Sequence, residues 1–287
     1  MNEKIRVGPG RKLDLAIASI FGKLKSNIDF SFVEEKQRTI LFTSALPNEG
    51  KTTIAVNVAV AMAASDQKTI LVDADMRNPS SHLLFNLVNS RGLSDIISQS
   101  CDWRQFIYKT KVPNLYLITA GRKPSNPSRF LNSERFRNLL TELAAEFDYI
   151  VLDTPPVLLV PDTQIISAHV DGVILVIKNG KTPRESVKEA HETLLRANAN
   201  VIGAVLNHAG KKDNIYGYGY GADSKTANRV PARVHRTAPE KNPAAGSAGA
   251  TGFAGAASAG EPAKSYGTPK PSAAVKSVGP MKPSKEN

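Results

Sequence analysis

Short runs of apolar, β-branched residues alternate with longer stretches of helical periodicity between residues 39 and 207. Six runs have the length and composition of strands: TILFTS from Thr39, TILVDA from Thr69, NLYLITA from Asn114, YIVLD from Tyr149, GVILVIK from Gly172 and VIGAVLN from Val201. Their apolar residues follow one another with little alternation, which is typical of parallel strands covered by helices on both faces. The pattern predicts an α/β fold with a mostly parallel central sheet flanked by helices.

Helical periodicity fills the gaps between these runs. Residues 133–147 place one stripe of apolar side chains along a helix, namely Phe136, Leu139, Leu140, Leu143 and Phe147. A second helix is predicted after TPRE, where Thr182 and Glu185 fit a capping box and Pro183 suits the first turn.

The composition changes in the last quarter of the chain. Residues 222–287 are mainly Ala, Gly, Pro, Ser and Lys, a composition that buries too little surface to offset the entropy of ordering. We therefore expect a disordered tail at 222–287. Before it we expect a leader at 1–38 with one helix over 13–27, a folded domain at 39–210 and a tyrosine cluster at 211–221.

Most of the net positive charge belongs to this tail. It carries ten Lys or Arg and four Asp or Glu, while the 287-residue chain has a formal net charge of +11. A basic tail attracts polyanions such as nucleic acid or an anionic membrane, or serves only as a solvating tether. We find no long apolar run and no signal-peptide pattern, and Cys101 is the single cysteine. We therefore expect a cytoplasmic protein that does not itself span a membrane.

The stretch ALPNEGKTT, residues 45–53, lies between a predicted strand and a predicted helix. It matches the phosphate-binding loop, except that Ala45 replaces the first glycine. Such loops surround phosphate with backbone N–H groups at a helix N-terminus. We expect Lys51 to face solvent in the empty site and to reach the phosphates of ATP, and the Thr52 hydroxyl to bind Mg²⁺. The other expected nucleotide contacts are Pro47, Asn48, Glu49, Gly50, Thr53 and Asn207.

Two predicted strands end in carboxylates, at the edge where parallel sheets bind ligands. Asp73 and Asp75 lie two residues apart and so on the same side of their strand, and YIVLD ends in Asp153. We expect Asp75 and Asp153 to bind Mg²⁺ with Thr52, and Asp73 to act with Lys51 in catalysis, as the base. The alternative for Asp73 and Asp75 is a structural role in loop hydrogen bonds.

Other features narrow the chemistry of this site to phosphoryl transfer or hydrolysis from ATP. The five histidines have no metal-ligand spacing, which favours oxygen-bound Mg²⁺ over zinc. Pro155 and Pro156, which follow the third carboxylate, are expected to turn the chain away from the nucleotide.

The order of these motifs resembles that of the bacterial tyrosine kinases of capsular and exopolysaccharide biosynthesis. The resemblance covers residues 13–220 and is carried by LPNEGKTT, ILVDADMRNPSSHLLF, GLSDII, NPSRFLNSERF, YIVLDTPPV, DGVILVIKNG and VIGAVLN. It implies a P-loop NTPase fold and an ATP- and Mg²⁺-dependent protein-tyrosine autokinase that regulates polysaccharide polymerisation or export.

The resemblance also implies a function for the sequence YGYGYG. The family has its autophosphorylation sites near the carboxyl end, which here are Tyr216, Tyr218 and Tyr220. Glycine spacers keep each phenol accessible to the active site of another molecule. The alternative is an unmodified aromatic low-complexity stretch.

The partners implied by the resemblance are a separate membrane activator of the polysaccharide co-polymerase type, a cognate tyrosine phosphatase and further kinase subunits phosphorylated in trans. The kinase would then be recruited to the inner face of the plasma membrane, and no specific nucleic acid is expected. In the family, a Glu, Arg, Arg pattern on an N-terminal helix docks subunits into a ring, but Ser19, Gly22 and Lys25 stand here. The sequence therefore does not support a ring.

Two further function classes fit parts of the sequence. One is a positioning ATPase of the partition or division-site type, which would bind DNA or membrane through the basic tail. The other is a catalytically silent regulatory module. The tyrosine cluster, and the absence of a second lysine early in the phosphate loop, favour the kinase. In that loop Asn48 replaces a glycine of the family, and asparagine tolerates left-handed backbone geometry.

Overall fold

The computed structural model describes residues 15–32, 38–99, 101–208 and 276–278. Its strands are β1 (Arg38–Ser44), β2 (Thr69–Asp73), β3 (Tyr108–Lys109), β4 (Leu115–Ile118), β5 (Tyr149–Asp153), β6 (Gly172–Lys178), β7 (Val201–Asn207) and β8 (Lys276–Val278). Its helices are α1 (Leu15–Phe30), α2 (Lys51–Ala63), α3 (Ser81–Phe85), α4 (Leu93–Gln99), the 3₁₀ helix η1 (Trp103–Phe106), α5 (Pro127–Leu131), α6 (Glu134–Glu146), α7 (Asp162–Ser167) and α8 (Arg184–Arg196).

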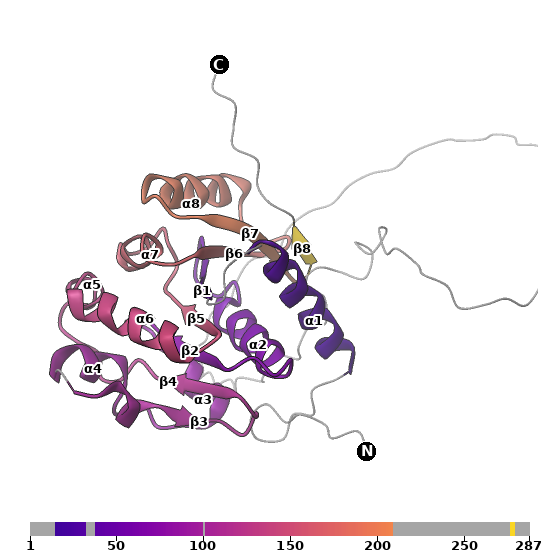
Figure 1. Cartoon of the computed structure of the whole chain (residues 1–287). Coiled ribbons are helices and arrows are strands. Elements are labelled where there is room, and N and C mark those ends of the chain that lie inside the picture. The colour runs from indigo at the N-terminus through magenta and orange to yellow at the C-terminus, as the bar shows by residue number, and fades with distance from the viewer. Residues whose placement is uncertain (1–14, 33–37, 100, 209–275, 279–287) are drawn as a thin grey trace, which may run out of the picture. The chain divides into compact units, whose positions relative to one another are not determined.

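Within these residues the strands form one sheet in the order β3-β4-β2-β5-β1-β6-β7-β8 (Figure 1). The pairs from β4 to β7 are parallel, and only β3 and β8 run antiparallel to their neighbours. The prediction of an α/β fold with a mostly parallel sheet is therefore confirmed.

The six predicted strands all form, and two short edge strands were not predicted. β8 pairs with β7, with Leu206 opposite Lys276 and Ala204 opposite Val278. The prediction of a tail without secondary structure is therefore wrong for residues 276–278, where the edge of β7 supplies backbone partners that composition cannot reveal. The rest of the predicted tail lies outside the described residues.

Helices cover both faces of the sheet, which explains the near-continuous apolar strands. Along β1, Leu41 packs in one core cluster, with residues of α6, α7 and α8. Ile40 and Phe42 point to the other face and pack with α1 and α2. Figure 1 shows these two groups of helices on opposite sides of the sheet. Because alternate residues serve both cores, every position of β2 and β5 is buried, and so is every position of β1 after Arg38.

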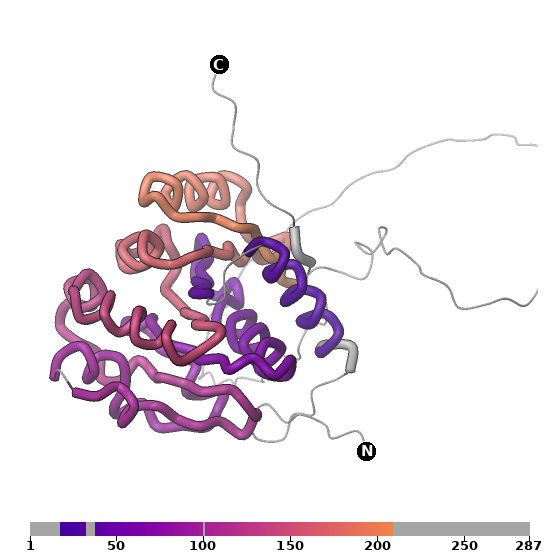
Figure 2. The backbone as a smooth tube through the Cα atoms, viewed as in Figure 1, coloured from indigo at the N-terminus to yellow at the C-terminus, as the bar shows by residue number. Residues whose placement is uncertain are grey.

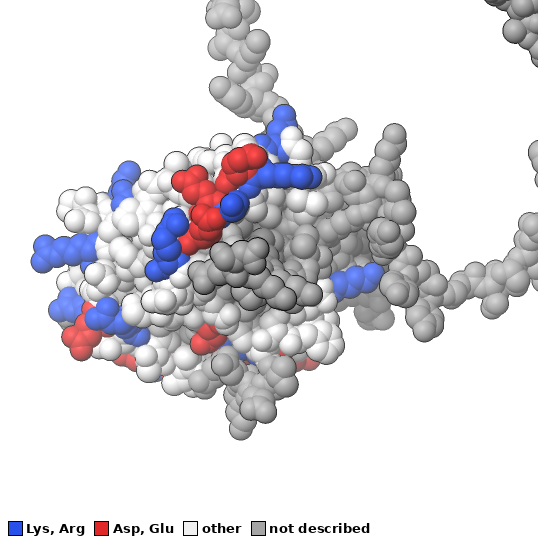
Figure 3. All heavy atoms as spheres, turned by 90° about the horizontal axis from the view of Figure 1, so that it is seen from above, with Lys and Arg blue, Asp and Glu red and all other residues white. Residues whose placement is uncertain are grey.

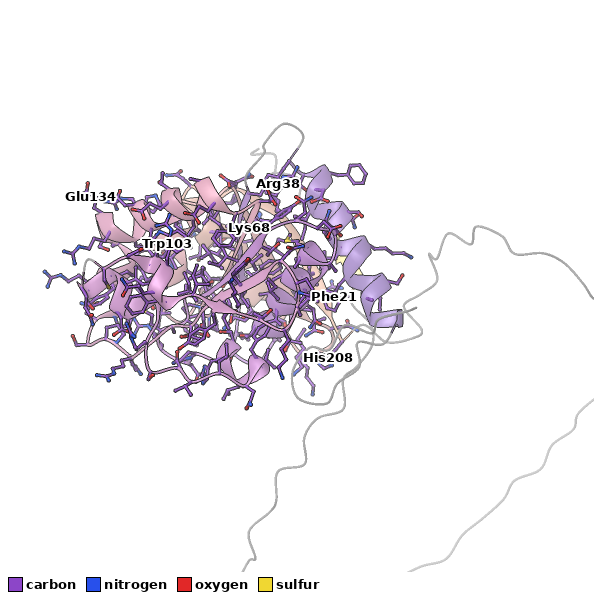
Figure 4. The ribbon with its side chains drawn as sticks, turned by 60° about the horizontal axis from the view of Figure 1, so that its bottom comes forward. Phe21, Arg38, Lys68, Trp103, Glu134 and His208 are labelled. Carbon is purple, nitrogen blue, oxygen red and sulfur yellow. The ribbon has the colours of Figure 1, made fainter. Side chains whose placement is uncertain are left out.

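The helix predicted over 13–27 is α1, and it belongs to the same core as the sheet. Phe21, Leu24 and Ile28 are buried in the core cluster that contains α2. In Figure 4, Phe21 points toward the domain. Figure 2 traces α1 beside α2. Asp29, near its end, accepts hydrogen bonds from Arg38 and the Tyr149 hydroxyl.

Lys25, one of the three positions compared above with a ring motif, makes a contact within α1. Lys25 forms an ion pair with Asp29 one turn later, with 2.6 Å between Lys25 Nζ and Asp29 Oδ2. Ser19 is exposed. Such a pair stabilises a helix by about 0.2–0.5 kcal/mol, so Lys25 contributes to local helix stability.

Of two helix starts predicted from the sequence, the one at Ser133 is confirmed and the one at Thr182 is not. Ser133 caps α6 by accepting a hydrogen bond from the Phe136 N–H, and the predicted apolar stripe is buried. The capping box at Thr182 is wrong, because α8 begins at Arg184, preceded by Pro183, with no side-chain cap. The Thr182 hydroxyl instead contacts Glu49 of the phosphate loop.

No helix of the described ranges is long and apolar enough to cross a membrane.

Candidate functional site

The loop between β1 and α2 adopts the left-handed geometry that phosphate binding requires. Asn48 has φ 61° and Gly50 has φ 93°, which confirms that asparagine takes the left-handed position of the missing glycine. A Cβ on Gly50 would lie 2.2 Å from Asn207 Nδ2. Glycine is therefore needed at position 50 for both backbone conformation and space.

A pocket of about 320 Å³ opens at the carboxyl ends of the strands, in front of this loop. Its lining includes the predicted residues Pro47, Asn48, Gly50, Lys51, Thr52, Thr53 and Asp75. It also includes residues that were not predicted: Arg77, Asn78, Ser80, Pro155, Pro156, Leu159 and Val160. The two prolines thus border the pocket, so the prediction that they lead the chain away from it is wrong.

Lys51 lies between two of the predicted metal-binding carboxylates. Its Nζ is 2.9 Å from Asp75 Oδ2 and 3.4 Å from Asp153 Oδ1. The side chain is 12% exposed, so the expectation that it faces solvent in the empty site is wrong. Burial alone lowers the pKa of the Lys51 ammonium, but the charges of Asp153 and Asp75 outweigh burial and raise that pKa.

The three carboxylates share this single cation. β2 and β5 are neighbours, and Asp73 lies directly opposite Asp153 in the register. Burial raises the pKa of Asp153 to about 7 and that of Asp73 to about 6, although the Lys51 charge opposes both shifts. The buried carboxylates therefore take up protons more readily than exposed ones, and a bound metal cation would stabilise their ionised forms.

The donor set fits Mg²⁺. Asp153 Oδ2 is buried without a hydrogen-bond partner, and Ser80 donates to the Thr52 hydroxyl at 3.1 Å on the same side of the pocket. Mg²⁺ prefers such hard oxygen ligands and is usually held by one or two carboxylates together with phosphate oxygens. Among the described residues no group of three or more His, Cys, Asp or Glu is arranged to hold a metal.

The raised carboxyl pKa values predict the pH dependence of stability in the empty domain. From about pH 4 to about pH 7 the folded state binds more protons at Asp153 than the unfolded state, so stability is lost as pH rises through that window. Denaturation midpoints of wild type and Asp153→Asn, measured without nucleotide or metal, should diverge: the wild type should fall more steeply with pH. Parallel curves would contradict the assignment.

Asp73 is enclosed by the loop that follows β2. Like Asp153, it is fully buried and absent from the pocket lining, whereas Asp75 lines the pocket. Its Oδ2 accepts from the Ser81 hydroxyl at 2.6 Å and from the N–H groups of Ser80 and Ser81, and its Oδ1 accepts from the Asp75 N–H. These are the loop hydrogen bonds that the alternative expects, and catalysis by Asp73 stays a prediction.

Two predicted nucleotide contacts lie behind the loop. Glu49 is 3% exposed, and its Oε2 accepts from the Leu46 N–H at 3.1 Å. Asn207 Nδ2 donates to the Glu49 carbonyl at 2.9 Å, and its Oδ1 accepts from the His208 N–H. Figure 4 marks His208, where β7 has ended. Both side chains support the loop, and neither lines the pocket.

Arg77 is a site residue that the sequence reading missed, although it follows the acidic motif directly. Its guanidinium binds Asp162 through two hydrogen bonds, of 2.7 and 3.0 Å, and also contacts Ser128 at 3.1 Å. Asp162 is buried at the start of α7. Arg77 thereby connects the pocket lining to α5 and α7. The predicted phosphorylation sites Tyr216, Tyr218 and Tyr220 lie outside the described residues.

Comparisons with known proteins identify the relatives of this chain. A family model described as an AAA domain matches residues 38–202. The putative tyrosine-protein kinase CapB of Staphylococcus aureus is 38% identical over 208 residues, which are 72% of this chain and 91% of CapB. The tyrosine-protein kinase YwqD of Bacillus subtilis is 37% identical over 69% of this chain and 83% of YwqD.

Solved structures show the same likeness. The crystal structure of the chimerical protein CapA2B2 has a TM-score of 0.64 at 37% identity and covers 67% of this chain and 84% of its own. The kinase domain of the Escherichia coli tyrosine kinase ETK also has a TM-score of 0.64, at 31% identity over 71% and 80% of the two chains. The septum site-determining protein MinD of Pyrococcus horikoshii, in complex with Mg-ADP, shares only the fold, at 22% identity and a TM-score of 0.53.

Proposed function

The chain belongs to the bacterial tyrosine-protein kinases, and we propose that its pocket binds ATP with Mg²⁺ and transfers the γ-phosphate to tyrosine hydroxyls. The observation that carries this proposal is the position of Lys51 at the end of the phosphate loop, 2.9 Å from Asp75 and 3.4 Å from Asp153. One cation and two carboxylates thus converge where the loop would place the β- and γ-phosphates.

Different groups of the pocket position the phosphates of ATP and neutralise their charge. Backbone N–H groups of the loop and the N-terminus of α2 orient the phosphates, and Lys51 neutralises negative charge that develops on the transferring group. Asp75, Asp153 and the Thr52 hydroxyl would hold Mg²⁺, which when bound neutralises phosphate charge. In the reaction the tyrosine oxygen bonds to the γ-phosphorus, the bond from that phosphorus to the β,γ-bridging oxygen breaks, and the tyrosine gives up its proton.

The metal assignment predicts the behaviour of two conservative variants. Asp75→Asn and Asp153→Asn each remove one negative charge from the proposed metal site while preserving side-chain size. Both variants should need roughly tenfold more Mg²⁺ for half-maximal phosphorylation at saturating ATP. The exposed pair partner Glu192→Gln on α8 is a matched control and should titrate like wild type. Wild-type metal dependence in both site variants would exclude these carboxylates as ligands.

Asp73 as the acceptor of the tyrosine proton is a separate prediction. Asp73→Asn should slow phosphoryl transfer by more than it weakens ATP binding, because the carboxylate is needed only when the proton leaves. Ser81→Ala keeps that carboxylate but removes its 2.6 Å hydrogen bond, so this variant should retain most of the activity. Nucleotide titrations and single-turnover rates separate the two effects. Equal losses in both variants would assign Asp73 a structural role.

The tyrosine cluster and the partners complete the proposal. Phosphates on Tyr216, Tyr218 and Tyr220 would each add nearly two negative charges to a basic region, which makes the cluster a charge switch. As the resemblance of its motifs implies, the kinase would work with other kinase subunits, a cognate phosphatase and a separate membrane activator of the polysaccharide co-polymerase type. The activator would recruit it to the inner face of the plasma membrane, where it would regulate capsule or exopolysaccharide polymerisation or export.

No observation on the described residues favours the positioning ATPase, and the basic tail through which it would bind lies outside them except at 276–278. The likeness to MinD shows the fold alone. On the face that Figure 3 displays, Lys and Arg lie among Asp and Glu, as in the chain of Lys188, Glu192 and Arg196 along α8. A surface of mixed charge does not attract a polyanion as a continuous basic patch does.

A further inference from the structure

The phosphate loop is supported by Thr182, which follows β6 and is not part of the loop. The Glu49 carboxylate is buried between two donors that come from different parts of the chain. Its Oε2 accepts from the Leu46 N–H within the loop, and its Oε1 accepts from the Thr182 hydroxyl, 133 residues further along. Glu49 therefore connects the loop to the segment between β6 and α8.

The Thr182 hydroxyl is oriented toward this carboxylate. Its oxygen accepts from the Lys178 N–H at 2.9 Å, and the Thr182 N–H in turn donates to the Lys178 carbonyl at 3.0 Å. One lone pair of the hydroxyl is thus engaged, and its single proton can go to Glu49 or to the Lys178 carbonyl at 3.2 Å. A carboxylate oxygen is a stronger acceptor than a backbone carbonyl, so the proton belongs to the bond with Glu49.

Two more hydrogen bonds reach the loop, one from the last residue of β6 and one from the last residue of β7. Lys178 Nζ donates to the Asn48 carbonyl at 3.1 Å, and Asn207 Nδ2 donates to the Glu49 carbonyl. Asn48 and Gly50, on either side of Glu49, hold the left-handed conformations on which the direction of the loop N–H groups depends. Hydrogen bonds therefore fix both the side chain and the main chain of Glu49, which lies between Asn48 and Gly50.

We propose that Thr182 is a positioning residue for ATP binding: through the Glu49 carboxylate it holds the phosphate loop in its binding conformation. Thr182 does not line the pocket and does not cap α8. Its effect on nucleotide therefore passes through Glu49. This inference rests on the proposed function of the pocket as an ATP site.

Thr182→Val preserves the shape of the side chain and removes the hydroxyl, so that a buried carboxylate oxygen loses its donor. The variant should bind MgATP about tenfold more weakly than wild type. Thr182→Ser restores the hydroxyl and should bind within about twofold of wild type. Thr141→Val, on the exposed side of α6, is the matched control and should change nothing. The measurement is a fluorescence titration with a labelled ATP analogue and Mg²⁺ on the full-length chain.

A mutant cycle with Glu49→Gln distinguishes this connection from a general loss of stability. If Thr182 acts through the carboxylate, Thr182→Val should cost clearly less than tenfold in affinity in the Glu49→Gln background. Wild-type affinity in Thr182→Val, an equal loss in both backgrounds, or failure of Thr182→Ser to restore binding would overturn the inference. Failure of the wild-type chain itself to bind MgATP would contradict the proposed function instead.

Discussion

Lys51→Met is expected to reduce tyrosine phosphorylation by roughly 100-fold or more. Methionine has a similar length but no charge, so the transferring phosphoryl group loses the cation that the phosphate loop supplies. Transfer of labelled phosphate from ATP to the chain measures the effect. Lys188→Met, at a lysine that is 81% exposed on α8, is the matched control and should keep wild-type activity. Wild-type activity of Lys51→Met would contradict the assignment of the site.

Lys51→Met should also change the affinity of the site for metal in the absence of nucleotide. In the wild type Lys51 Nζ contacts the two carboxylates that a metal would use. Without nucleotide, Mn²⁺ should therefore bind Lys51→Met more tightly than wild type, since Asp75 and Asp153 are then free. Electron paramagnetic resonance of Mn²⁺ measures this directly. Equal affinity for the two proteins would show that Lys51 does not compete with metal.

Stability provides a second measurement on that variant. Removing one partner of a buried ion pair typically costs about 3–5 kcal/mol, and proton uptake by Asp153, whose pKa is already about 7, would recover part of it. Lys51→Met should thus unfold at a lower temperature than wild type without ligands, and Mn²⁺ should raise its melting temperature more. The control Lys188→Met should melt like wild type.

Replacing Tyr216, Tyr218 and Tyr220 together by Phe is expected to remove most of the phosphate that the chain incorporates. Phenylalanine keeps the aromatic ring but has no hydroxyl to accept the phosphoryl group. Mass spectrometry of the phosphorylated chain provides the measurement. Tyr266→Phe, which changes a tyrosine outside the cluster, is the matched control and should leave incorporation unchanged. Undiminished phosphate on the triple variant would show that the cluster is not the substrate.

Transfer to this cluster should occur mainly between molecules. β7 ends at Asn207, and an extended chain from there to Tyr216 spans at most about 30 Å, so reach alone does not exclude transfer within one molecule. The phenol must also lie in line with the γ-phosphate, in a pocket bordered by Pro155 and Pro156. That alignment is easier for a segment arriving from another copy, because its approach is not limited by a short connection to the same sheet.

The central sheet could be predicted from local composition because burial on both faces leaves a local signature. β5, β6 and β7 begin and end where the apolar runs do. The phosphate loop was equally predictable, because Asn48 and Gly50 are residue types that adopt left-handed backbone conformations readily. β8 was not, since a three-residue strand exists only through the edge of β7 to which it pairs.

Contacts between distant parts of the chain account for what the sequence reading missed at the site. Lys51 was expected to face solvent because a motif does not show how many carboxylates converge on it. That number depends on β2 and β5 being neighbours in the sheet. Likewise, a threonine three residues before a glutamate is a sound local signal for a helix cap. At Thr182 a buried acceptor on Glu49, far away in the sequence, determines the outcome instead.

One measurement tests the central claim most directly, namely that this pocket transfers phosphate from ATP to the tyrosine cluster of another copy. Cells of the source organism, which contain any activator, would express an untagged wild-type chain together with a tagged Lys51→Met chain. The tagged chain would then be isolated and its phosphotyrosines located by mass spectrometry. The predicted result is phosphate on Tyr216, Tyr218 and Tyr220 of the inactive chain, which disappears when the untagged partner also carries Lys51→Met. An inactive chain without phosphotyrosine beside a phosphorylated wild-type chain, or phosphate that persists when both chains are inactive, would contradict the account.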